Sequence, residues 1–153
     1  MFLFQKKIVF AARKTSGYDF SGRITSYDIV DINEGAGFDQ QSGKFRAPEG
    51  GTYFFTFSGM TSGYPKSVTR VRVYKDGSEH HYISDANKAD TGNNINGSWM
   101  SSLSKGEEVH LEVTGGKLRA SSNRPVIFTG NLLKLDEWAH PNGLISKFNF
   151  DKK

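Results

Sequence analysis

Residues 52–57, with the sequence Thr-Tyr-Phe-Phe-Thr-Phe, constrain the fold more than any other part of the chain. Alternate residues of a β-strand point the same way, so Tyr53, Phe55 and Phe57 share one face. Three aromatic side chains on one face bury more area than a neighbouring strand alone can cover. We therefore expect a central strand whose aromatic face packs against an opposite sheet. Gly50 and Gly51 precede it and let the chain enter the core from a surface turn.

The same alternation of apolar and polar residues recurs along the chain between turn signals. It predicts strands at 7–13, 24–33, 52–60, 68–74, 95–103, 108–114 and 126–135, with shorter ones at 43–45 and 82–83. Asp76 and Gly77 predict a tight hairpin, residues 104–107 predict a second, and Gly115 and Gly116 open a loop that ends at Pro125. With 12 Phe, 6 Tyr and 17 Gly, the composition favours an all-β sandwich or jelly roll over a helical bundle.

Length, cysteine content and charge limit the number of domains and the kinds of partner. A chain of 153 residues makes one domain and can bury a core without metals, and the absence of cysteine excludes disulfides. The net charge of +4 is spread along the chain, which permits anionic partners but does not indicate nucleic acid. No apolar stretch reaches the roughly 18 residues of a membrane span, so we expect no membrane insertion.

Several motifs stand at the intervals of a known family pattern. The residues that carry it are Tyr27, Asn33, Phe38, Phe45, Gly51, Tyr53, Phe55 and Phe57. Their spacing resembles that of the globular head of complement C1q and its relatives, which favour Phe where this chain has Tyr27. Residues 8–12 (IVFAA), 105–111 (KGEEVHL) and 128–133 (FTGNLL) resemble further motifs of that family. The resemblance runs in unbroken order from 8 to 133.

The resemblance implies a ten-strand jelly-roll sandwich, related to the tumour-necrosis-factor ligands, that assembles as a homotrimer and binds rather than catalyses. It divides the chain into a lead-in at 1–7, a domain at 8–135 and an extension at 136–153. We expect that extension to pack on the domain or to be partly disordered. Core and trimer packing are expected from Tyr27, Phe38, Phe45, Tyr53, Phe55, Phe57 and Phe128.

Two substitutions and one omission depart from the family pattern. His110 replaces the usual Trp and Asn131 the usual Phe, so part of the aromatic packing is expected to be weaker or rearranged. The collagen-like stalk of many relatives is absent from this sequence, which argues against complement activation. We also expect the row of Tyr53, Phe55 and Phe57, with Phe54 and Trp99, to leave apolar surface that drives self-association.

The metal-binding and catalytic candidates are few. His80 and His81 are adjacent, so on a strand they point to opposite faces and one metal ion cannot easily take both. No nucleophile elbow, paired-histidine zinc motif or phosphate-binding glycine loop is present, so we expect no enzyme. Some relatives bind calcium at the trimer apex, and Asp85 and Asp90 remain as candidates. No other cofactor is expected.

Two basic clusters are candidate ligand sites. Arg70, Arg72 and Tyr74 share one face of the predicted strand 68–74, where two guanidinium groups beside an aromatic ring can hold anions. The alternative to an anion site is that these residues form an ordinary solvated strand face. Lys117, Arg119 and Arg124 form the second cluster, in a segment at 115–125 that has no carboxylate.

Two hypotheses of function follow. The first is a secreted, innate-immune or lectin-like module that binds anionic glycans or microbial surfaces. The second is a structural or signalling trimer, such as a ligand, a matrix component or the oligomerising part of a larger protein. Asn96 begins an Asn-Gly-Ser acceptor sequence for N-glycosylation, which has meaning only if the chain is secreted.

Overall fold

The computed structural model describes residues 6–63, 67–85 and 92–136, with the backbone alone for residues 84 and 85. The predicted extension at 136–153 lies outside them except for its first residue. They form eleven strands: β1 (Val9–Lys14), β2 (Gly17–Arg23), β3 (Ile29–Glu34), β4 (Phe38–Asp39), β5 (Lys44–Arg46), β6 (Gly51–Thr61), β7 (Thr69–Lys75), β8 (Ser78–Asp85), β9 (Asn94–Leu103), β10 (Glu108–Ala120) and β11 (Val126–Leu135). The prediction of an all-β sandwich is confirmed. Over these residues there is no helix that could cross a membrane.

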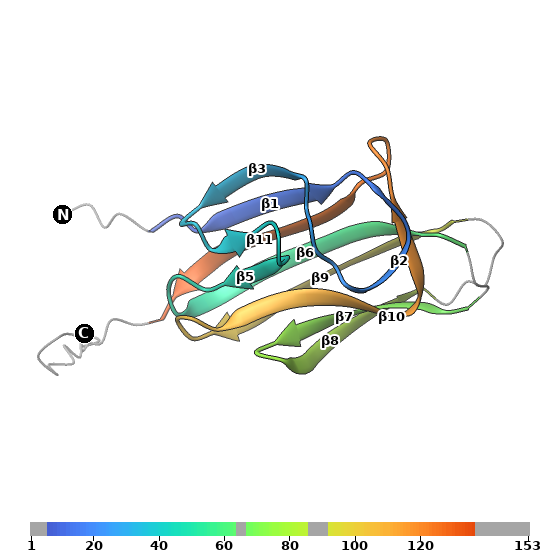
Figure 1. Ribbon diagram of the computed structural model, residues 1–153. Helices are drawn as coiled ribbons and strands as arrows, with labels where there is room; N and C mark the ends of the chain where they lie inside the picture. The colour runs from blue at the N-terminus through green and yellow to red at the C-terminus, as the bar shows by residue number, and fades with distance from the viewer. Residues whose placement is uncertain (1–5, 64–66, 86–91, 137–153) are drawn as a thin grey trace, which may run out of the picture.

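The strands form two layers (Figure 1). In the first layer the order is β3-β1-β11-β6-β9, and every neighbouring pair is antiparallel. In the second layer β10 is central, with β7 and β8 on one side and β5 and β4 on the other. The start of β1 and the end of β11 lie at one end of the sandwich, and the β10–β11 hairpin lies at the opposite end.

The long strand β10 joins the two layers. Its first half pairs with β7 up to Gly115, and its last residues pair with the end of β6 through Leu118 and Arg119. The register shifts between Val113 and Gly115, and Gly116 has a φ of +62°. The loop predicted at 115–125 is therefore wrong over its first half. The glycine pair bends the strand in a bulge instead of ending it, because glycine adopts positive φ without steric cost.

Aromatic side chains from both layers fill the core. The structure places Tyr27, Phe38, Phe45, Tyr53, Phe55, Phe57 and Phe128 among its buried residues. Phe10 of β1 stacks on Phe38 with ring centroids 4.6 Å apart, and its ring meets Phe128 edge-on at 4.9 Å. The central position of β6 between β11 and β9 agrees with its aromatic face. Edge-on and offset contacts of this kind add to the area that each ring buries.

Two residues of the spacing pattern have clear structural reasons. The side chain of Asn33 donates a hydrogen bond to the carbonyl of Phe38 at 2.9 Å and accepts one from the Phe38 N–H at 3.1 Å. These two hydrogen bonds close the turn that brings Phe38 into the core. Gly130 lies beneath two rings: a Cβ there would be 2.5 Å from Phe10 and 2.6 Å from Phe55. Only glycine lets both rings approach the backbone of β11.

The predicted strand at 24–33 is wrong in its first half. Residues 24–28 carry Ile24 and Tyr27 into the core as an irregular segment, and β3 begins only at Ile29. Ser26 has a φ of +54°, which no regular strand contains. The segment immediately before it, where no strand was predicted, forms β2 along β10.

The hairpin predicted at Asp76 and Gly77 is present. Both residues have positive φ, at +47° and +78°, as a two-residue hairpin turn of this hand requires. The strand that follows is longer than predicted, because β8 pairs with β7 from Ser78 to Asp85 rather than over residues 82–83 alone.

Candidate functional site

A cleft of about 260 Å³ opens at the end of the sandwich that carries the β10–β11 hairpin. Arg119 and Arg124 line it together with Tyr18 and Met60. Four segments contribute: Arg119 lies next to the end of β10, Arg124 precedes β11, Tyr18 lies on β2 and Met60 lies on β6. The structure thus brings together two of the three cations in the second predicted cluster.

The hairpin fixes the position of Arg124. Its backbone N–H donates to the Ser121 carbonyl at 3.1 Å and to the Ser121 hydroxyl at 3.2 Å, and the Ser121 N–H donates back to the Arg124 carbonyl at 3.1 Å. The Arg124 guanidinium also donates to the sulfur of Met60, at 3.3 Å between Nη1 and Sδ. No carboxylate lines the cleft within the described part of the chain. Among the described residues, the Met60 sulfur is a weak acceptor for this guanidinium, which has further N–H donors for a ligand.

Room for Arg119 comes from a glycine. A Cβ at Gly92 would lie 2.7 Å from the Arg119 Nη2 atom and 2.4 Å from the carbonyl oxygen of Thr61. Lys117, the third cation of the predicted cluster, does not line the cleft. Its carbonyl accepts a hydrogen bond from the Ser62 N–H at 2.9 Å, which holds the backbone of β10 against the end of β6.

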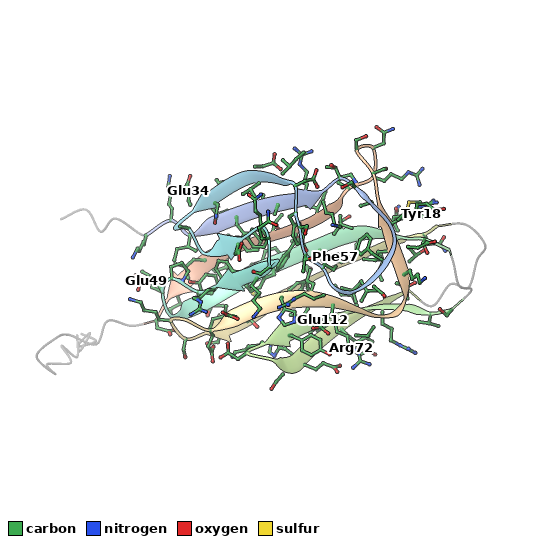
Figure 2. The ribbon with its side chains drawn as sticks, viewed as in Figure 1. Tyr18, Glu34, Glu49, Phe57, Arg72 and Glu112 are labelled. Atoms are coloured by element: carbon green, nitrogen blue, oxygen red, sulfur yellow. The ribbon has the colours of Figure 1, made fainter. Side chains whose placement is uncertain are left out.

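The other predicted cluster is partly neutralised. Arg70, Arg72 and Tyr74 do share the outward face of β7, and Arg72 forms an ion pair with Glu79 across the hairpin. Arg72 also lies opposite Glu112 of β10, and both are labelled on the outer surface of this layer in Figure 2. Carboxylates beside a guanidinium compete with any anionic ligand, so this face is a poorer anion site than the cleft.

His110, which stands where the family pattern has tryptophan, is buried beside Tyr74. Its ring stacks on Tyr74 at 5.2 Å between centroids with planes 7° apart, and its Nε2 atom lies 3.0 Å from Glu112. Asn131 points away from the core, on the outward face of β11 opposite Phe54. The two substitutions therefore fall on the sides of opposite layers that face away from the aromatic core, with His110 buried and Asn131 partly buried.

The metal candidates are not brought into a site. His80 lies 2.7 Å from the Ser101 hydroxyl, and His81 packs near Trp99 with ring centroids 6.4 Å apart. The side chain of Asp85 and the whole of Asp90 fall outside what the structure describes. Among the residues it does describe, no three His, Asp or Glu side chains are grouped so that they could hold a metal ion.

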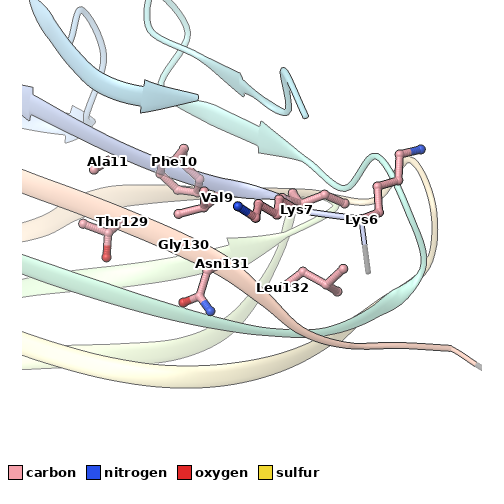
Figure 3. A pocket seen from close by; sticks show the side chains of 10 residues that line it. Lys6, Lys7, Val9, Phe10, Ala11, Thr129, Gly130, Asn131 and Leu132 are labelled. Atoms are coloured by element: carbon pink, nitrogen blue, oxygen red, sulfur yellow. The ribbon is translucent and has the colours of Figure 1, made fainter. Parts of the chain in front are cut away.

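The outward face of the first layer is the second notable surface. Its partly buried or exposed side chains include Val9, Ala11, Phe54, Met100, Ile127 and Thr129. A groove of about 500 Å³ crosses it over β1 and β11 (Figure 3). Lys6, Lys7 and Asn131 add polar groups at its walls.

The expected source of association surface is wrong for Tyr53, Phe55, Phe57 and Trp99, but Phe54, which was expected with them, does face outward. The other four are buried within one chain, with Trp99 7% exposed, because the opposite layer covers them. The apolar area that remains available comes from the other side of the same strand, where Phe54 points outward.

The C1q domain family matches residues 9–133. The chain belongs to the C1q domain family. Complement C1q tumor necrosis factor-related protein 3 of Mus musculus is 32% identical to this C1q domain over an alignment of 132 positions, which covers 83% of this chain and 51% of that protein. The Homo sapiens protein of the same name gives the same values. The chain therefore spans about half the length of the curated relatives it matches.

Solved structures share the fold. The globular domain of zebrafish complement 1qA protein superposes with a TM-score of 0.68 at 16% identity, over 84% of this chain and 99% of that one. Murine APRIL at pH 5.0 superposes with a TM-score of 0.60 at 15% identity, over 83% of this chain and 100% of that one. These likenesses establish a jelly roll of the C1q and tumour-necrosis-factor type.

Sequence reasoning missed Tyr18 and Met60. Tyr18 lies in a short segment between Gly17 and Gly22, and no strand was predicted there. It reaches the cleft only because β2 pairs with the end of β10, where Gly17 lies opposite Ala120. The available signal was the alternation of Tyr18 and Phe20 with the polar Asp19 and Ser21.

Proposed function

We propose that this C1q domain is a non-enzymatic, extracellular recognition module that self-associates as a homotrimer and binds anionic glycans or microbial surfaces. The observation that carries the ligand proposal is the cleft at the hairpin end, where Arg119 and Arg124 converge. Paired guanidinium groups bind sulfate, carboxylate and phosphate through two parallel hydrogen bonds each.

Self-association rests on the outward face of the first layer. It combines apolar side chains from three adjacent strands, among them Val9, Phe54 and Ile127, with the groove over β1 and β11. Burying such a surface contributes roughly 25 cal/mol per Å² of apolar area. Association of identical copies usually closes symmetrically, and the family resemblance makes three the expected number.

Trimer formation would strengthen a weak site. Each chain contributes two arginines at the cleft, so three copies would present three such pairs. A polymeric anion that spans several clefts gains affinity through effective concentration, which a small anion cannot do. Polymeric glycans therefore suit the arrangement better than small molecules.

The test is the salt dependence of binding to a sulfated polysaccharide. The parent should bind more weakly as salt rises, because contacts between exposed charges are screened. The double variant Arg119→Ala/Arg124→Ala should lose most of the affinity. The double variant Arg70→Ala/Arg72→Ala removes the same charge from another surface and should keep it. An affinity that changes neither with salt nor with the cleft substitutions would contradict the proposed site.

A structural or signalling trimer is the second candidate. It is favoured by the relatives, which are named as tumor necrosis factor-related proteins, and by the fold shared with APRIL. A chain that associates strongly through the Phe54 face but binds no polyanion would fit this second role.

A further inference from the structure

Tyr18 is unusually exposed for an aromatic residue. The residue is 74% exposed, more than the outward-facing Met100 at 65%, although it stands on a strand that pairs with β10. Figure 2 shows Tyr18 at the hairpin end of the sandwich. Because this exposed ring stands at the wall of a cleft, it is available to contact a ligand bound there.

The backbone on both sides of Tyr18 holds it outward. Gly17 and Asp19 have φ values of +136° and +51°, so the strand is kinked before and after the tyrosine. Phe20 anchors the segment, because it lies opposite the buried Leu118 and the Lys14 ammonium sits 5.5 Å from its ring centre. The ring of Tyr18 is therefore presented from a fixed point of the fold and not from a free loop.

The cleft joins this ring to two cations. Tyr18 forms one part of the wall, and Arg119 and Arg124 form another, with Met60 packed against Arg124. A simple anion can use only the guanidinium groups. A sugar ring that carries an acidic group can use both parts, because its C–H face packs on the aromatic face while its acid accepts from the arginines.

The size of the cleft limits the ligand. Its volume of about 260 Å³ is below the roughly 300–1,000 Å³ of pockets that enclose drug-sized molecules. One ring of a polysaccharide fits that space, and the rest of the polymer would extend into solvent.

We propose that Tyr18 is the specificity-determining residue of this cleft, a stacking platform that selects acidic sugar units over other polyanions. This rests on the proposed function, which needs only the arginines. Without Tyr18 the cleft would bind any polymer of sufficient negative charge. With it, the apolar contact is available only to a ligand that has a ring beside its charge.

The experiment compares two polyanions of matched charge, dextran sulfate and inorganic polyphosphate, which has no sugar ring. Dissociation constants are measured for the parent, Tyr18→Ala, Tyr18→Phe and Arg119→Ala/Arg124→Ala. Tyr18→Ala should weaken dextran sulfate binding about three- to tenfold, the range of a good ring contact, and leave polyphosphate binding unchanged. Tyr18→Phe keeps the ring and should behave as the parent.

The outcomes separate the two proposals. Equal affinity of the parent for both polymers, with no effect of Tyr18→Ala, overturns the platform and leaves the arginine site in place. A loss of both affinities in Tyr18→Ala also overturns it, since a ring contact cannot act on polyphosphate. Arginine variants that bind both polymers like the parent overturn the proposed function itself. Unchanged melting temperatures show that all variants are folded.

Discussion

Replacing Phe55 with alanine tests the central packing argument directly. The Phe55 side chain is completely buried in β6. Its ring lies 5.4 Å from Trp99, 5.7 Å from Phe45 and 6.4 Å from Phe10, measured between centroids. Beneath it lies Gly130, which has no side chain that could move into the space. The cavity left by the substitution would therefore stay largely open.

These contacts set the expected magnitude. Removal of a core phenylalanine usually costs about 3–5 kcal/mol of unfolding free energy, and more when the site cannot collapse. Each lost ring pair adds roughly 0.5–1.5 kcal/mol beyond the buried area, so we expect the upper part of that range. For a domain of this length, the melting temperature should fall by about 10 °C or more.

The assay is thermal and chemical denaturation of parent and variant at low protein concentration. Because association stabilises the folded state, the melting temperature must first be shown to be independent of concentration. Phe54→Ala is the matched control, since it removes the same ring from the outward face of the same strand. It should cost less stability in the single chain and should weaken self-association instead. A Phe55→Ala variant that melts within a degree or two of the parent would refute the reasoning.

Three further results are expected. Gly130→Ala should destabilise the protein by about 1–3 kcal/mol, measured by denaturation, because its Cβ would meet Phe10 at 2.5 Å. The hydrogen bond from Lys44 lowers the pKa of Glu108 below its ordinary value of 4.5. The stability gained from Glu108 is thus present above that value and lost as the pH falls through the lowered pKa of the folded state. Melting temperatures of parent and Glu108→Gln should therefore differ near neutral pH and converge in acid. Asn96 is exposed on the outward side of β9, which belongs to the face proposed for self-association. A glycan on Asn96 would block that face. After expression in a secreting host, any glycan-bearing chains should therefore be confined to the unassociated fraction. Mass spectrometry of the separated fractions checks this, and a glycan on associated chains would contradict it.

Local patterns predicted the core strands well. The alternation of Tyr53, Phe55 and Phe57 identifies a buried central strand because the period of a strand is a property of adjacent residues. The hairpin at Asp76 and Gly77 follows for the same reason, since the turn conformation depends on those two residues alone.

Features that depend on distant contacts were not predictable in this way. The sequence of residues 24–28 looks like part of a strand. In the structure the segment is irregular: Ser26 has a positive φ, and Tyr27 is buried in the core between the layers. From sequence alone, the glycine pair at 115 and 116 indicates a loop. In the structure β10 continues through it, because β7 pairs with the strand before the glycines and β6 pairs with it after them.

The same distinction between local patterns and distant contacts applies to the candidate site. Arg119 and Arg124 were found because they are close in sequence on one hairpin. Tyr18 was missed because about a hundred residues separate it from them, and only the pairing of β2 with β10 brings it near. The neutralisation of Arg72 by Glu79 also depends on tertiary detail, since the β7–β8 register shifts between Val73 and Tyr74.

The position of β11 has a consequence for how the protein is made. β11, the last of the described strands, lies between β1 and β6, so it supplies the hydrogen bonds that connect β1 to the centre of its layer. A ribosome that has synthesised everything up to Pro125 holds a chain in which β1 pairs only with β3 and one edge of β6 is open. Open edges of this kind are where strands from other chains add. The domain can therefore close only after its last described residues have left the ribosome, and chaperones that cover strand edges should matter most in that interval.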